Sequence, residues 1–415
     1  MSGHNKQTVA VVGAGVVGIC SALELQRAGY QVTLFDKTPP GEGASYGNAG
    51  FLARQLISPL AENMSVFSAI KMWISPNSPL SLPPSQLINL ATWLVRFMRQ
   101  TSQKNIEVSR GAINSLNELS VGAWERLLND IDGLHFLRKP GFLLLWKSKN
   151  TIEDVISQRD MMQRYGIKCE LINSAKIREL EPELDQQLSH ALYFEDAYQV
   201  SDPYKLCQAL FSKFIERGGV FVNQEVVSIS QKGETVCLKA SKELVFHKIV
   251  ICTGAWSKKL LRWLGLDIPL VAERGYHVDF EKNDLNIKHL IASAENRFFI
   301  SPFDTLIRIV GISEMGGLRL GAIKSRFKLL KKHSSGVIPK LRSVKHKSLW
   351  MGHRSTLPDS LPIIDRHPQY PNILLAFGHQ HLGLTQAAIT AEILLQVIQN
   401  EEPCIDISPY SATRF

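Results

Sequence analysis

Three glycines, Gly13, Gly15 and Gly18, follow a short apolar run with the spacing G-x-G-x-x-G. In such a turn the first glycine permits a tight bend, the second lets the backbone approach a pyrophosphate, and the third lets a helix pack closely on a strand. Asp36 follows about 20 residues later, where a carboxylate can accept hydrogen bonds from both hydroxyls of an adenosine ribose. These residue types at this spacing predict a site for the adenine half of a dinucleotide.

The elements around the glycines support this interpretation. The run TVAVVG (Thr8–Gly13) is typical of a strand buried on both faces, and YQVTLFD predicts a second strand that ends at Asp36. Between them we expect a helix over Val16–Ala28 that stops at Gly29, with the phosphates at its N-terminus. A lone G-x-G-x-x-G is weak evidence, but a strand, a helix, a second strand and a terminal acid in this order are strong evidence.

Two other interpretations of the apolar run fit less well. A transmembrane helix needs about 20 apolar residues, and this run is interrupted sooner by Glu24 and by the glycines. A signal peptide would have a small-residue cleavage site after its apolar core, whereas SALELQRAGYQ continues as an amphipathic helix. We therefore interpret the run as part of a nucleotide-binding domain.

The composition sets the class of protein. The chain has 415 residues, of which 45% are hydrophobic and 20% charged, as in ordinary soluble proteins. This length fits two domains that share an interface. The six cysteines lie far apart and form no CxxC pair or Cys/His cluster, so we expect neither a disulfide framework nor a metal site. Such cysteines suit a reducing cytoplasm best.

The net charge of +9 is concentrated in the segment Lys324–Lys347. Around it, Leu320, Ile323, Phe327 and Leu330 recur at helical spacing, with basic residues on the other side. One interpretation is a helix packed on the protein with a solvated basic face. The other is a docking surface for anionic lipid at the inner membrane or for an acidic partner. A nucleic-acid partner is not expected, because no recognised nucleic-acid module accompanies the charge.

The segments that follow favour FAD over NAD. GEGASYGNAG (Gly41–Gly50) is a loop of small residues, suited to wrapping a bulky ligand, and no second strand–helix unit follows it at once. Further buried strands appear much later, in FHKIVICTGAWS (Phe246–Ser257) and in NILLAFGHQHLGLTQAAITAEILLQVI (Asn372–Ile398). The latter reads as a strand, a glycine-rich turn and a long helix beginning near His381. Strands from distant parts of the chain predict a discontinuous cofactor domain.

Seven ordered motifs carry a resemblance to a known family. They are VVGAGVVG, ASYGNAG, DAYQVSDP, ERGYHV, IRIVGISEMGGL, WMGHRSTLPDSLPIID and AFGHQHLGLT, and the resemblance spans Val9 to about Ile398. Together they resemble the FAD-dependent D-amino-acid oxidase superfamily, and most closely its bacterial D-amino-acid dehydrogenase branch. The resemblance implies one non-covalently held FAD, since no cysteine lies within GHRSTLPDSLP, where sarcosine-oxidase relatives carry theirs.

The resemblance also implies the fold class, which is α/β. It combines a glutathione-reductase-type (Rossmann-like) FAD-binding domain with a second, mixed-sheet α+β substrate domain. We expect residues 1–90, 197–262 and 345–415 to form the discontinuous FAD-binding domain. Residues 91–196 and 263–344 would form the substrate domain.

Local signals predict the next helix and strand of the cofactor domain. SDPYKLCQALFSKFIERGG predicts a helix that is capped by Ser201 or Asp202, has Pro203 in its first turn and ends at Gly218. The following VFVNQEVVSI predicts a strand that returns to the cofactor sheet. In the family, the backbone of this strand near Val226 contacts the adenine side.

Motif and resemblance together predict the residues that contact FAD. They belong to the glycine turn, the ribose acid, the small-residue loop, the adenine-side strand, the Thr-Gly pair and the C-terminal glycine turn. They are Gly13, Ala14, Gly15, Val16, Val17, Gly18, Asp36, Lys37, Ser45, Asn48, Ala49, Gly50, Val226, Thr253, Gly254, Trp256, Gly378, Gly383, Leu384 and Thr385. The helix after the last turn is expected to direct its N–H groups and positive end at flavin N1 and C2=O.

Arg354 is the predicted clamp for a substrate carboxylate. A guanidinium offers a planar pair of donors, and this position is similar to the carboxylate-binding arginine of related amine and glycine oxidases. The alternative is a structural arginine paired with Asp359 or Asp365. Arg274 is a reserve candidate for the clamp.

Two further residues are predicted to take part in catalysis. Tyr276 shares a strand face with Arg274, and either hydrogen-bonds the substrate carboxylate or packs in the core. His381 either contacts the substrate or the flavin face, or caps the helix that follows it.

These expectations describe an oxidative deamination. Hydride leaves the Cα of a neutral D-amino acid for flavin N5, and the imino product hydrolyses to a 2-oxo acid and ammonia. The resemblance implies a quinone or another carrier as the electron acceptor. Three alternatives stay open: a cyclic secondary amine such as D-proline or hydroxy-D-proline as substrate, a non-catalytic flavin-binding subunit, and an NAD-dependent dehydrogenase.

Overall fold

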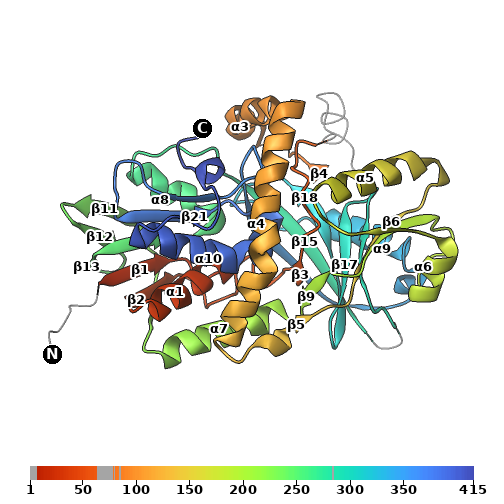
Figure 1. Ribbon diagram of the computed structural model, residues 1–415, viewed down its shortest axis with the longest axis horizontal. Coiled ribbons are helices and arrows are strands. Elements are labelled where there is room, and N and C mark those ends of the chain that lie inside the picture. The colour runs from red at the N-terminus through yellow and green to blue at the C-terminus, as the bar shows by residue number, and fades with distance from the viewer. Residues whose placement is uncertain (1–6, 63–77, 79, 84–85, 283–284) are drawn as a thin grey trace.

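The strand before the glycine turn lies in the middle of a six-stranded sheet (Figure 1). The sheet order is β10-β2-β1-β14-β21-β20, and only β20 runs antiparallel to its neighbour. The strands are β1 (Thr8–Val12), β2 (Gln31–Asp36), β10 (Val220–Asn223), β14 (Lys248–Ile251), β20 (Ile363–Arg366) and β21 (Ile373–Phe377). The computed structural model describes residues 7–62, 78, 80–83, 86–282 and 285–415.

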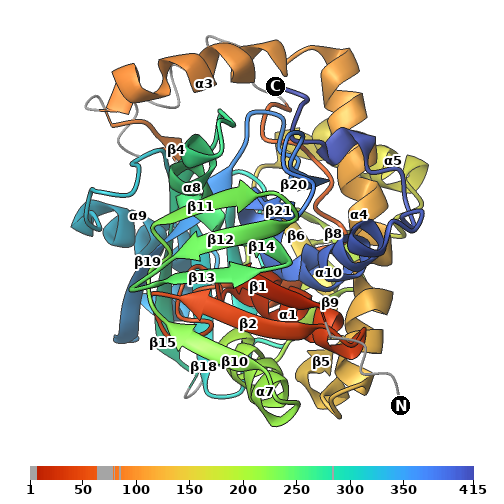
Figure 2. The same ribbon diagram turned by 90° about the vertical axis from the view of Figure 1, so that its left-hand side faces the viewer.

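β1 is buried on both faces, as its continuous apolar run predicts. Val11 packs in one hydrophobic cluster with helices α1 (Val16–Arg27) and α10 (Gly383–Gln399). Val12 packs in a second cluster with a small antiparallel sheet on the opposite face, seen in front in Figure 2. That sheet consists of β11 (Ser228–Lys232), β12 (Thr235–Lys239) and β13 (Glu243–Phe246).

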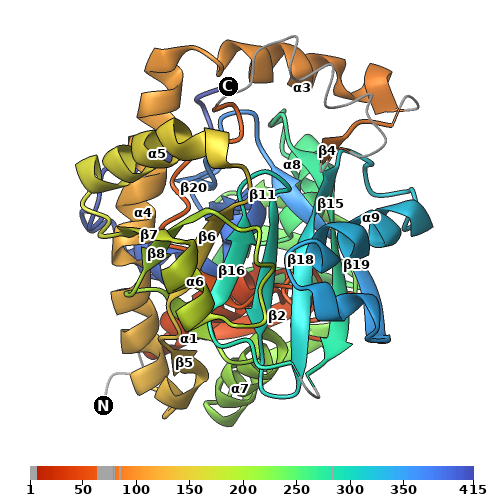
Figure 3. The ribbon, with the colours of Figure 1, turned by 90° about the vertical axis from the view of Figure 1, so that its right-hand side faces the viewer.

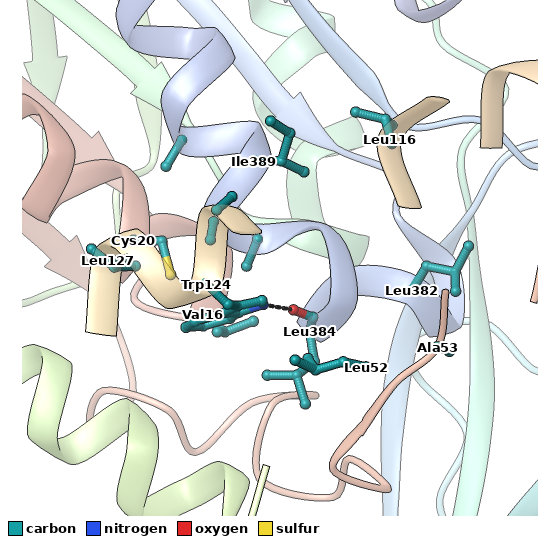
Figure 4. Packing of buried hydrophobic residues seen from close by; sticks show 14 of the residues in the cluster. Val16, Cys20, Leu52, Ala53, Leu116, Trp124, Leu127, Leu382, Leu384 and Ile389 are labelled. Carbon is teal, nitrogen blue, oxygen red and sulfur yellow. Dashed lines mark hydrogen bonds between the residues drawn. The ribbon is translucent and has the colours of Figure 1, made fainter. Parts of the chain in front are cut away.

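The long helix α4 (Gln103–Asn129) packs against α10 and supports its beginning. The indole Nε1 of Trp124 donates a 2.9 Å hydrogen bond to the carbonyl oxygen of Leu384, in the first turn of α10 (Figure 4). Trp124 is fully buried. The sequence assigned residues 91–196 to the substrate domain, but this part of the range lies against the cofactor domain because its apolar face covers α10.

A second, nine-stranded mixed sheet forms the other half of the molecule (Figure 3). Its order is β19-β15-β18-β17-β16-β6-β8-β7, with β4 beside β18. The strands are β4 (Leu80–Ser81), β6 (Phe142–Trp146), β7 (Glu170–Asn173), β8 (His190–Phe194), β15 (Val271–Glu281), β16 (Leu290–Ser293), β17 (Phe298–Pro302), β18 (Leu306–Glu314) and β19 (His346–Thr356). β19 falls within the range 345–415 that the sequence assigned to the cofactor domain, but it pairs with β15 along its whole length and so belongs to this sheet.

The remaining elements connect or cover the two sheets. A short three-stranded sheet brings together segments from three parts of the chain, and helices pack on the outside. These elements are β3 (Phe51–Leu52), β5 (Leu137–Arg138), β9 (Tyr198–Val200), α3 (Leu87–Arg99), α5 (Ile152–Arg164), α6 (Ser174–Leu180), α7 (Pro203–Glu216), α8 (Ser257–Trp263) and α9 (Lys324–Ser335).

Most local predictions around the cofactor domain are confirmed. α7 is capped by Asp202, whose carboxylate accepts hydrogen bonds from the backbone N–H groups of Tyr204 and Lys205. β10 follows and pairs with β2, as expected for the returning strand. α1 ends at Arg27, and Gly29 has the left-handed φ of +92° that ends such a helix.

The basic helix α9 packs on β15 and β18, with Phe327 and Leu330 buried. It begins at Lys324, later than the apolar spacing predicts, so Leu320 and Ile323 precede it. Several of its lysines are exposed. The interpretation of a helix with a solvated basic face describes this arrangement.

Within the described residues, one helix, Gln380–Gln399, is apolar and long enough to cross a membrane. Two thirds of it, 67%, is buried inside the protein, and it packs against α1 and α4. These contacts are those of a core helix.

Gly18 shows how tightly α1 approaches the glycine turn. A Cβ at Gly18 would lie 1.8 Å from the carbonyl oxygen of Gly13, so Gly18→Ala forces backbone apart. We expect the substitution to destabilise the protein by about 1–3 kcal/mol and to lower the thermal unfolding midpoint. Gly111→Ala is the matched control, because a Cβ there meets nothing within 4 Å inside helix α4 and should stabilise slightly. Equal midpoints for both variants would contradict this account.

Candidate active site

The glycine turn follows the carboxyl end of β1 and bends back toward β14. Gly13 has a φ of +109°, and a Cβ there would lie 2.4 Å from the carbonyl oxygen of Cys252. Its N–H donates to the carbonyl oxygen of Phe35 at 2.7 Å. The protein itself therefore requires glycine at this position, independently of any ligand.

Gly15 and Gly383 differ, because protein contacts do not require glycine at either position. A Cβ at Gly15 would meet only the hydroxyl oxygen of Ser45, at 3.5 Å, and one at Gly383 only the Cβ of His379, at 3.7 Å. Both glycines line cavities and precede or begin a helix with no acid in its first turn and no cap from its own N-cap residue, although the Val16 N–H of α1 donates to the Ser45 hydroxyl at 3.0 Å. Uncapped N–H groups beside open space can receive a phosphate or an electron-rich ring edge.

Asp36 is directed toward the glycine turn. One carboxylate oxygen accepts a 2.7 Å hydrogen bond from the N–H of Ala14, and the other accepts from the N–H and the hydroxyl of Thr38, at 2.9 and 3.0 Å. A carboxylate has about four acceptor positions, and three are used here, so capacity remains for one ribose hydroxyl. Asp36 thus fixes the turn and can bind the ligand at the same time.

A cavity of about 340 Å³ runs from Asp36 across the glycine turn to Gly383. The predicted cofactor residues that line it are Gly13, Gly15, Val16, Val17, Asp36, Lys37, Ser45, Val226, Thr253, Gly254, Trp256 and Gly383. At its adenine end the Lys37 ammonium lies 4.7 Å from the centre of the Trp256 ring. The site therefore suits an anionic ligand with a flat aromatic part.

A second cavity of about 460 Å³ adjoins the first, and the two share Val16, Ser45, Gly383 and Arg354 in their walls. It extends between the cofactor sheet and the nine-stranded sheet. Asn48, Ala49 and Leu384, also predicted cofactor residues, line this second cavity. The shared wall means that one elongated ligand can reach from one cavity into the other.

Five predicted cofactor residues lie in neither wall and have contacts within the protein. Ala14 and Gly18 hold the glycine turn through the contacts given above. A Cβ at Gly50 would meet the carbonyl of Val200, and one at Gly378 would meet the side chain of Leu357. The Thr385 hydroxyl accepts from the N–H of Ala53 and donates to the carbonyl oxygen of Phe51.

Arg354 lies in the walls of both cavities, on the face of the nine-stranded sheet that is turned toward them. Its Nη1 is 3.0 Å from a carboxylate oxygen of Glu273, directly opposite on β15, and 3.4 Å from the Ser313 hydroxyl. The expected alternative partners are wrong, because Asp359 pairs with Arg414 and Asp365 accepts hydrogen bonds from Ser411 and Ala412. The side chain keeps 20% of its surface accessible and is not saturated.

Glu273 remains ionised although it is buried. Burial raises its pKa, but Arg354 and hydrogen bonds from the hydroxyls of Ser313 (2.5 Å) and Thr356 (2.8 Å) lower the pKa below its usual value overall. An ionised Glu273 fixes the direction of the Arg354 guanidinium. Glu273 was not predicted from the sequence, although it lies in ERGYHV and alternation along the strand puts it on the face opposite to Arg274 and Tyr276.

His381 faces the second cavity from the turn before α10. Its side chain is exposed at the cavity wall; partial desolvation in this enclosed position, followed by the charge of Arg354, lowers its pKa to about 4. The imidazole is therefore neutral at physiological pH and can accept one hydrogen bond and donate another.

Arg274 and Tyr276 do share a strand face, but it is the opposite face of the sheet from Arg354. Both contact the carboxylate of the buried Glu314. Nη2 of Arg274 lies 2.7 Å from it, and the Tyr276 hydroxyl donates a 2.6 Å hydrogen bond to it. Arg274 also donates to the carbonyl of Gly321. Its position does not support the role of reserve clamp, and the Tyr276 hydroxyl is engaged away from the cavity although other atoms of the residue line it.

The mainly parallel sheet with its glycine turn, and the cavity that continues to a half-buried arginine, define a dinucleotide-dependent oxidoreductase with a separate substrate chamber. The chain belongs to the DAO family, whose model, described as FAD dependent oxidoreductase, matches residues 8–397. Its cofactor is FAD, which confirms the prediction. The predicted α/β fold class, with a Rossmann-like FAD domain and a mixed-sheet substrate domain, is likewise confirmed.

Similar proteins cover the same length. The chain is 28% identical to a D-amino-acid oxidase of Bradyrhizobium diazoefficiens over 98% of both chains. Among solved structures, it is similar to a glycine oxidase from Geobacillus kaustophilus, with a TM-score of 0.80 and 21% identity over 99% of this chain and 100% of that one. It is also similar to an L-proline dehydrogenase from P. horikoshii, with a TM-score of 0.76 and 18% identity over 99% and 98%. The two solved structures show a shared fold.

Asp36→Ala should weaken FAD binding, because it removes the ribose acceptor and loosens the turn at Ala14. We expect the Kd for FAD to rise about 10- to 100-fold, the usual effect of losing hydrogen bonds to a charged group, measured by titrating apoprotein and following flavin fluorescence. Asp267→Ala removes an exposed carboxylate outside both cavities and should leave the Kd unchanged. Full FAD retention in Asp36→Ala would contradict the ribose assignment.

Proposed function

We propose that this protein oxidises the Cα–N bond of a D-amino acid, giving an imino acid that water hydrolyses to a 2-oxo acid and ammonia. The observation that carries the proposal is Arg354, a partly accessible arginine in the wall shared by the FAD cavity and the adjoining chamber. The chain's similarity to a D-amino-acid oxidase over 98% of both chains supports the substrate class. The electrons would then pass to a quinone or another carrier.

The residues of the chamber suit a substrate with a carboxylate. The ion pair with Glu273 fixes one edge of the Arg354 guanidinium, and the other edge is available for a two-pronged contact with a carboxylate. Gly383 and Leu384 line the same chamber as Arg354. FAD, when bound, accepts the hydrogen and two electrons that leave the substrate Cα.

No described residue has to remove a proton from Cα if hydrogen leaves with its electron pair. The uncapped N-terminus of α10 places its positive end at the chamber, where it stabilises negative charge that develops nearby. Neutral His381 can accept a hydrogen bond from the substrate amine.

A second candidate is a cyclic secondary amine, such as D-proline or hydroxy-D-proline. His381 favours it, because a neutral imidazole at the chamber wall can bind a secondary N–H or a ring hydroxyl. The likeness to an L-proline dehydrogenase concerns the fold alone.

Anaerobic reduction of the flavin tests the function. The purified yellow protein is mixed without oxygen with a panel of D-amino acids, their L-enantiomers, D-proline and hydroxy-D-proline, and the loss of flavin absorbance near 450 nm is followed. We expect bleaching by D-amino acids and recovery on adding a quinone. Bleaching by cyclic amines alone would favour the second candidate. A flavin that no amine reduces would identify a non-catalytic flavin-binding subunit.

Arg354→Gln should selectively impair substrates that carry a carboxylate. We expect KM for a D-amino acid to rise about 10- to 100-fold, because a charge-assisted, two-pronged contact is lost, while the protein retains its FAD. The matching amine without the carboxylate should be affected little. Unchanged kinetics for the amino acid would exclude Arg354 as the clamp.

We further propose that the enzyme acts in the cytoplasm and touches the inner membrane through the basic segment Lys324–Lys347. Lys324, Lys328 and Lys332 recur every four residues along α9 and are exposed, so they lie along one side of the helix. At low salt, the enzyme should sediment with vesicles rich in phosphatidylserine, and replacing these three lysines with glutamate should abolish this binding. No binding of the parent enzyme to such vesicles would contradict this proposal.

A further inference from the structure

Arg297 is a second arginine in the substrate chamber. It lies in the wall of the 460 Å³ cavity, at the end of the hairpin between β16 and β17. Its φ is +49°, a left-handed conformation that residues with side chains rarely adopt. A left-handed residue is common at the end of a hairpin loop, and such residues also cluster at active sites.

The Arg297 guanidinium has no ion pair and no hydrogen bond among the described residues, whereas the other charges of the chamber are paired. Glu62 pairs with Arg110 at 2.6 Å, and Glu273 pairs with Arg354 at 3.0 Å. Arg297 is exposed at the cavity wall, and partial desolvation there lowers its pKa. Since His381 is neutral, the chamber keeps one uncompensated positive charge.

Strand β18 relates the two arginines in space. Ser313, which contacts Arg354, and Gly311, beside which the Arg297 carbonyl lies, are two positions apart and both line the chamber. Arg297 and Arg354 line the same cavity of about 460 Å³. One ligand that fills this cavity can therefore contact both arginines.

We propose that Arg297 binds a second anionic group of the substrate, so that the enzyme favours amines with two carboxylates, such as D-glutamate-like amino acids, over those with one. This inference rests on the proposed function for the first carboxylate, which Arg354 holds. The second carboxylate neutralises the remaining charge of the chamber. Arg297 is then a specificity-determining residue, and the reaction at Cα is unchanged.

Binding of inert substrate mimics tests this without turnover. Glutarate has two carboxylates and butyrate has one. Calorimetric titration of the FAD-loaded enzyme should give a Kd for glutarate at least about tenfold below that for butyrate, as expected for one added charge-assisted contact. Arg297→Gln should remove the difference by weakening glutarate only. Arg297→Lys, which keeps the charge, should retain part of it.

The control is Arg262→Gln, which removes one positive charge from the exposed side of α8 outside both cavities and should leave both Kd values unchanged. Equal affinities in the parent protein would overturn the proposal. It would equally be overturned if Arg297→Gln weakened glutarate and butyrate by the same factor, because Arg297 would then hold the carboxylate they share.

Kinetics separate this inference from the proposed function. In the parent enzyme, kcat/KM should be higher for D-glutamate than for D-norvaline. Arg297→Gln should reverse this order. If D-norvaline bleaches the flavin but D-glutamate does so no better, the second anion site is wrong and the proposed function stands. If no amine bleaches the flavin while glutarate still binds through Arg297, the proposed function is wrong and the anion site stands.

Discussion

The substrate chamber depends on the ion pair between Glu273 and Arg354, which joins β15 to β19 at the cavity wall. A buried pair of this kind is favourable only when its remaining hydrogen-bonding positions are satisfied. Ser313 and Thr356 do this for the carboxylate. The pair therefore orients the arginine without adding net charge. Because His381 is neutral, Arg297 alone among the described residues gives the chamber its positive charge.

Chemistry that depends on neighbouring residues could be predicted from the sequence. The turn at Gly13, the ribose acid Asp36 and the cap at Asp202 each reflect a backbone requirement met within a few residues or one strand–helix–strand unit. The long helix after Gly383 is predictable for the same reason. The family resemblance added FAD and the fold class, because its motifs span nearly the whole chain.

Features that depend on strand register could not be predicted. Arg274 and Tyr276 were expected near the substrate, but the register of β15 against β19 turns Glu273 to the cavity instead. β18 contains a bulge at Ile312, in left-handed conformation with a φ of +59°, that no local pattern announces. The direction of the chain after the hairpin determines where the Arg297 side chain points. A single arginine before a predicted strand does not indicate this direction.

The order of the strands has a consequence for biosynthesis. β1 and α1 are synthesised before β14, which begins at Lys248, and α10, which begins at Gly383, although these later elements flank and cover them. A nascent chain therefore exposes the apolar sides of the first unit until α10 has been synthesised. The wall at Gly383 is added only with α10, so the complete flavin site forms only after this helix has been made.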